Sequence, residues 1–156
     1  MVNDAEVRNV RKIFALVVIA LAALAVSASG VSASSSSIVI PFEKHAVGPG
    51  HYVGTAGDGG TIEMQVYDSS FTGGDPETSD HWIQHFKATL QLTVGGQSLT
   101  AALDGQFNFT TRQTVLNGVV LDGWLSGAQI HEEGQVVGFS PLTFVGTVMV
   151  MRGSAN

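Results

Sequence analysis

The 156 residues include 13 acidic side chains, 7 basic side chains and no cysteine, and the formal net charge is −6. A hydrophobic share of 44% with only 13% charged residues excludes a disordered chain or a coiled coil, and the acidic balance argues against a nucleic-acid interface built on a basic patch. The lack of cysteine excludes disulfides, thiolate zinc sites, iron–sulfur clusters and a cysteine nucleophile.

The N-terminal segment has the pattern of a secretory signal peptide. A basic stretch (8–12) precedes an apolar run over 13–26, and small residues follow. This pattern predicts a helical signal peptide that is cleaved after Ala33 or, alternatively, after Ala28. An uncleaved anchor over 13–33 is the competing interpretation, but a spanning helix needs about 20 predominantly apolar residues. The end of this segment is rich in Ser and Gly, so cleavage and secretion are the expectation. Because an exported protein without cysteine is more typical of prokaryotes, a prokaryotic source is expected.

Cleavage divides the sequence into a signal peptide (1–33), a flexible serine linker (34–37) and one folded domain (38–156). Residues 34–156 carry eleven acidic and four basic side chains, a net charge of −7. Such a surface disfavours phosphate backbones and anionic membranes. We therefore expect no nucleic-acid partner, and membrane association only through an uncleaved segment 13–33.

Alternation of apolar and polar residues dominates the domain. It is clearest over 86–94 and recurs over 61–67 and 106–110. This period of two is typical of antiparallel strands with one face on a core and the other in water, and no window shows a helical period. The predicted strands are 38–42, 51–56, 61–68, 82–94, 97–104, 106–111, 114–121, 124–132 and 142–151.

Turn signals separate these runs. Gly95-Gly96 lies between two alternating segments and predicts a hairpin, and Gly73 to Asp80 is read as a surface loop. Eight or nine short strands predict an all-β fold, a single small antiparallel β-barrel, with a two-sheet β-sandwich as the alternative. Further turns are expected at Asp104-Gly105 and Asn117-Gly118, and bulges or bends at Gly54, Gly123, Gly127 and Gly146.

Histidine is the first place to look for chemistry, and the domain has His45, His51, His81, His85 and His131. The i,i+4 pair His81 and His85 would lie about 13 Å apart on a strand, too far to share a metal.

His131 and Glu133 form the better pair, because i,i+2 spacing on a strand points both to one face. They could act as an acid–base pair, or hold a metal with His51, His81 or His85 as third ligand. The same residues are equally typical of a strand that runs into a turn. His131 and Glu133 are thus the candidate catalytic residues, and the sequence assigns no metal and no cofactor.

Aromatic residues suggest a ligand-binding interior. Phe107, Phe109 and Phe144 fall on the apolar faces of their strands, and Trp82 and Trp124 are added as candidate ligand contacts. The alternative is that these side chains only fill the barrel. The last strand, 142–151, is apolar on both faces, which predicts a central strand or a homo-oligomer contact.

No motif identifies a family, a nucleophile elbow or a phosphate-binding loop. The leading hypothesis is an exported, non-enzymatic all-β domain that binds a small apolar molecule or a partner surface. One alternative is a small secreted enzyme, a metal-assisted hydrolase or isomerase, that uses His131 and Glu133. The other is a structural, envelope-associated domain that oligomerises.

Overall fold

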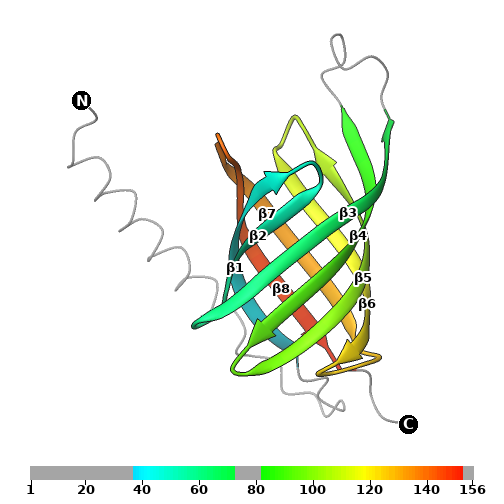
Figure 1. Ribbon diagram of the computed structural model, residues 1–156. Coiled ribbons are helices and arrows are strands. Elements are labelled where there is room, and N and C mark those ends of the chain that lie inside the picture. The colour runs from blue at the N-terminus through cyan, green and yellow to red at the C-terminus, as the bar shows by residue number, and fades with distance from the viewer. Residues whose placement is uncertain (1–36, 73–81, 153–156) are drawn as a thin grey trace, which may run out of the picture. The chain divides into compact units, whose positions relative to one another are not determined.

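The computed structural model describes residues 37–72 and 82–152 as one closed β-barrel (Figure 1). Each antiparallel strand pairs with the next one along the chain. The eight strands are β1 (Ser37–Gly48), β2 (His51–Ala56), β3 (Gly60–Thr72), β4 (Ile83–Val94), β5 (Gln97–Asn108), β6 (Gln113–Gly123), β7 (Gln129–Phe139) and β8 (Leu142–Met151).

The expectations for the N-terminal segment lie outside the described residues. These are the signal peptide (1–33) with its cleavage sites Ala28 and Ala33, and the linker up to residue 36. Ser37, the last residue of the predicted linker, is the first residue of β1. Within 37–72 and 82–152, the structure holds no helix of the length and apolarity that a membrane crossing requires.

Pairing of the first strand with the last closes the barrel. β1 runs antiparallel to β8 in unbroken register from Ser37 opposite Met151 to His45 opposite Thr143. A sandwich would leave two sheets with free edges, whereas this pairing leaves none in the described fold. The prediction of an all-β barrel is confirmed, and β8 is hydrogen-bonded on both sides.

The predicted alternation sorts side chains between the interior and the solvent. On β4, Phe86, Ala88 and Leu90 are buried, while Lys87 and Gln91 between and beyond them are exposed. The other strands repeat this phase, so that their inward side chains merge into one apolar core. The largest fully buried apolar side chains are Ile62, Leu90, Leu92, Leu116, Ile130, Val120, Val148 and Val150.

Two dipeptides expected to form turns lie inside strands instead. Asp104-Gly105 is part of β5 and Asn117-Gly118 is part of β6. A Cβ added to Gly118 would lie only 1.9 Å from the carbonyl oxygen of Ala102 on the neighbouring strand. Glycine here permits a close approach of two backbones rather than a change of chain direction. The two runs predicted over 97–104 and 106–111 are therefore one strand.

Glycines 54 and 146 have the same role and do not form bulges. A Cβ on either would lie 1.9 Å from a carbonyl oxygen of the adjacent strand. Gly123 and Gly127, in contrast, have positive φ values of 82° and 83° and flank the turn between β6 and β7. The strand predicted over 124–132 was therefore wrong in extent, since β7 begins at Gln129 and continues to Phe139.

Core burial gives a direct test of the strand assignment. Leu90 is fully buried, so Leu90→Ala should lower the free energy of unfolding by about 2–5 kcal/mol through lost transfer energy and a cavity. Gln91→Ala, at the next residue on the outer face, should change it by less than about 0.5 kcal/mol. Urea unfolding measures both, and equal effects would contradict the assigned phase of β4.

Candidate functional site

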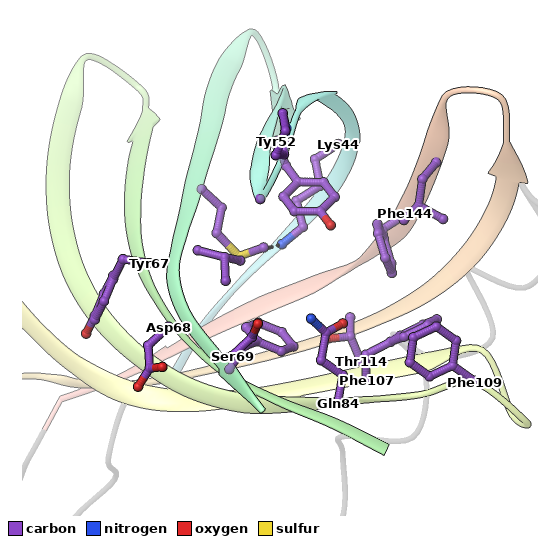
Figure 2. Close-up of a pocket in the computed structure, with 16 residues that line it drawn as sticks. Lys44, Tyr52, Tyr67, Asp68, Ser69, Gln84, Phe107, Phe109, Thr114 and Phe144 are labelled. Carbon is purple, nitrogen blue, oxygen red and sulfur yellow. Dashed lines mark hydrogen bonds between the residues drawn. The ribbon is translucent and has the colours of Figure 1, made fainter. Parts of the chain in front are cut away.

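A cavity of about 370 Å³ opens at one end of the barrel (Figure 2). We call this the cavity end. It carries the β1–β2 turn with Pro49 and Gly50, and Leu142 at the start of β8. Its wall includes six aromatic side chains, namely Tyr52, Tyr67, Phe86, Phe107, Phe109 and Phe144. The barrel therefore holds an apolar core toward its other end and an open, aromatic-lined space at this one.

Three of the predicted ligand contacts meet in the cavity wall. The ring centroids of Phe107 and Phe144 lie 5.8 Å apart at an interplanar angle of 82°, and those of Phe107 and Phe109 lie 4.6 Å apart at 74°. Tyr52 adds a further edge-on contact to Phe144 at 5.7 Å. Such edge-to-face packing fixes the rings, so the cavity has a preformed shape.

The two tryptophans lie in different parts of the barrel. Trp82 stacks on Phe71 with centroids 4.8 Å apart and lies 4.3 Å from Phe109, so it belongs to the rim beside the cavity wall. Trp124 lies in the β6–β7 turn, where it packs against the apolar core and does not line the cavity. The structure therefore brings Trp82 near the three phenylalanines and leaves Trp124 apart from them.

A buried ion pair lies beneath the cavity, and its lysine lines the cavity floor. The Lys44 Nζ donates to Glu132 Oε1 at 2.5 Å, and the two side chains are 1% and 0% exposed. The same nitrogen lies 3.3 Å from the Met64 sulfur and 4.8 Å from the centre of the Phe42 ring. Lys44 also lines the cavity, so a buried cation held by a carboxylate, a thioether and an aromatic face lies against its floor.

Sequence reasoning missed this pair, although a signal for it was present. Lys44 continues the inward phase of Ile40 and Phe42 on β1, and Glu132 follows Ile130 on β7. Side chains along a strand alternate between its two faces, so a charged residue at an inward position must face the core. Two such residues of opposite sign predict a buried pair if their strands lie close.

Polar side chains without an intramolecular partner also line the cavity, and three of them are Thr114, Tyr52 and Gln84. Thr114 Oγ1 is buried, on a residue that is 4% exposed, and no described residue hydrogen-bonds to it. Figure 2 shows the Tyr52 hydroxyl and the Gln84 amide directed into the same space, and neither has a hydrogen-bond partner in 37–72 or 82–152. Burial raises the pKa of Tyr52 above its usual 10.0. The phenol therefore remains a neutral hydrogen-bond donor at physiological pH.

The predicted catalytic pair is on the outside of the barrel. His131 Nε2 lies 3.0 Å from Glu133 Oε1, and His131 Nδ1 lies 2.8 Å from Asn117 Oδ1. The structure thus brings His131 and Glu133 together on one face, as the spacing predicts. Both lie within β7, which continues for six residues beyond Glu133, rather than where a strand runs into a turn, and Glu133 is 66% exposed. A shallow depression nearby includes Asn117 but neither member of the pair.

The remaining histidines do not join that pair. His51 contacts Glu63 at 2.8 Å, and His85 contacts Thr72 at 3.1 Å. His81 lies outside the described residues. Across 37–72 and 82–152, no three His, Asp or Glu side chains are grouped closely enough to hold a metal ion.

Comparison of the chain with protein-family models, with curated proteins and with solved structures gives no match. The function is therefore argued from the chemistry of the cavity.

The buried pair makes a sharp prediction for stability. Lys44→Met or Glu132→Leu alone should lower the free energy of unfolding by about 3–5 kcal/mol, because each leaves one charge buried without its partner. The double variant Lys44→Met/Glu132→Leu should lose no more than about 1 kcal/mol, since apolar replacements of similar volume avoid the desolvation of both charges. Urea unfolding of all four proteins measures the coupling, and additive losses would contradict it.

The raised pKa of the Tyr52 phenol predicts that the folded protein loses stability at alkaline pH. A pKa that is higher in the folded than in the unfolded protein adds stability below the unfolded value, and this is lost as the pH rises through the folded value. Tyr52→Phe should therefore lose less stability than the parent protein between about pH 8 and about pH 11. Urea unfolding at both pH values tests this, with Tyr67→Phe, at a 63% exposed tyrosine, as the control. Equal alkaline losses in the parent and Tyr52→Phe would refute it.

Proposed function

We propose that this protein binds a small, largely apolar molecule in the cavity of its barrel. The observation that carries the proposal is the preformed space of about 370 Å³, walled by aromatic rings and floored by buried polar groups. Ligand sites are typically concave, mostly apolar and supplied with a few polar groups that fix orientation. The predicted signal peptide makes export part of the same proposal.

The size of the cavity limits the ligand. A dry cavity of about 150 Å³ accommodates benzene. The present cavity is somewhat more than twice that volume and opens to solvent past the exposed residues Tyr67 and Ser69. A molecule of about two rings matches it, and a longer one would project through the opening.

The position of the polar residues favours binding over the alternative of an enzyme that uses His131 and Glu133. That pair lies on the outer surface, where a shallow depression that includes Asn117 contains neither residue. The cavity, in contrast, contains hydrogen-bonding groups within an apolar wall. The binding proposal therefore places the ligand inside the barrel, on the opposite side of β7 from His131.

A neutral fluorescent dye tests the proposal. N-phenyl-1-naphthylamine should bind the purified protein saturably at one site, with the fluorescence increase expected of an apolar environment. Ser69 lines the cavity from β3, and the next residue, Ser70, does not. Ser69→Trp should fill the opening and weaken dye binding by about tenfold or more, equivalent to about 1.4 kcal/mol.

Ser70→Trp is the matched control, because it adds the same side chain on the adjacent residue. It should leave the dye affinity within about twofold of the parent protein. If the dye does not saturate, or if both variants weaken binding equally, the proposed site is wrong.

A further inference from the structure

We infer that the floor of the cavity recognises an uncharged carbonyl group, such as that of a ketone, ester or amide, on the bound molecule. The inference rests on the proposed function and adds the chemical class of the ligand. It follows from which polar atoms reach the cavity, which of their hydrogen bonds are already used, and how their charges balance.

The groups that reach the cavity floor can donate hydrogen bonds. An ammonium group has three N–H donors, and Lys44 directs two of them to Glu132 and Met64. The third has no partner among the described residues, and since Lys44 lines the cavity while only 1% exposed, we assign this buried donor to the ligand. The hydroxyl groups of Tyr52 and Thr114, which can donate as well as accept, are on the same wall and have no partner among the described residues.

The main acceptor near the floor, in contrast, is separated from the cavity. Glu132 is fully buried and does not line the cavity: its Oε1 accepts from Lys44, and its Oε2 is buried without a partner among the described residues. A ligand that enters the cavity therefore meets Lys44 before Glu132. A ligand atom that accepts hydrogen bonds, which a carbonyl oxygen does with two lone pairs, fits this arrangement better than a group that only donates.

Charge balance argues for a neutral ligand. The charge of Lys44 is already compensated by Glu132, and the pair as a whole is neutral. A carboxylate placed on the floor would add an uncompensated negative charge among aromatic rings, which is unfavourable in an apolar site. A carbonyl oxygen receives the hydrogen bonds without bringing that charge.

A hydrocarbon of the same shape should bind less well. It would cover Lys44, Tyr52 and Thr114 without offering a hydrogen bond, and buried polar groups that lose access to water without gaining a partner are costly. A site that hydrogen-bonds a ligand group commonly rejects the analogue that lacks this group.

Three naphthalene derivatives separate these possibilities through displacement of N-phenyl-1-naphthylamine. They are 2-acetylnaphthalene, 2-ethylnaphthalene and 2-naphthoate, which share the ring system and differ in the polar group. The ketone should displace the dye at about one-tenth the concentration that the hydrocarbon needs, and the carboxylate should be the weakest. The ketone is the less hydrophobic of the two neutral compounds, so simple partition into an apolar space predicts the reverse order.

The double variant Lys44→Met/Glu132→Leu tests whether the preference for the ketone over the hydrocarbon comes from the cavity floor. Measured against its own dye affinity, this variant should show a difference between ketone and hydrocarbon of about twofold or less. Infrared difference spectroscopy on the unmodified protein provides a second measurement. The carbonyl stretch of bound 2-acetylnaphthalene should lie at lower frequency than in an apolar solvent, because hydrogen bonds weaken the C=O bond.

The outcomes separate this inference from the proposed function. Saturable dye binding with no preference for the ketone, or with the carboxylate as the tightest ligand, overturns the inference and leaves the cavity as an apolar binding site. A carbonyl stretch unchanged from that in an apolar solvent also overturns it. Failure of the dye itself to bind overturns the proposed function, and with it the inference.

Discussion

Closure of the sheet by pairing β1 with β8 is the constraint on which the rest of this protein depends. With no cysteine in the sequence, hydrogen-bonded ladders and core packing hold the barrel together without covalent cross-links. Closure gives every inward side chain a place in one interior of fixed width. At one end the inward leucines, isoleucines and valines fill that width, and at the other the aromatic rings leave a cavity.

The Lys44–Glu132 pair lies where these two parts of the interior meet. A slip of β1 by one residue would place Lys44 on the solvent face and leave Glu132 buried without a partner. Such a slip would also expose Phe42 and Ile40, which share the phase of Lys44. Polar and apolar side chains of β1 thus specify the same register, and the pair contributes to specificity as well as to the chemistry of the cavity.

Much of the fold was predictable from the sequence, because apolar and polar residues alternate along a strand that has one face on the core and the other in solvent. The β4 residues 83–94 illustrate this, since their burial follows the alternation of the sequence. Glycine was the main source of error. Gly118 was read as part of a turn, but it allows β5 and β6 to approach closely, and only the three-dimensional neighbourhood distinguishes these roles.

The site was harder to predict than the fold. Phe107, Phe109 and Phe144 were identified because aromatic residues on an inward face must line either a core or a cavity, and the structure places them in the wall. Lys44 and Glu132 were missed because they are separated by 88 residues, and no local pattern shows that β1 and β7 lie close enough for a contact. The spacing within one strand instead indicated His131 and Glu133 as the candidate catalytic pair, and these share the outer face of β7.

The register at the closure brings the two ends of the barrel close together. Ser37 is paired with Met151, so the two ends of the barrel lie about one strand spacing apart, roughly 4.8 Å between neighbouring strands. A short linker could join them, and new termini could be opened at Gly95 and Gly96, in the tight turn between β4 and β5. Such a circular permutant would keep every neighbour of Lys44. The site is thus a property of the order of strands around the barrel, and the order of the same strands along the polypeptide is free to change.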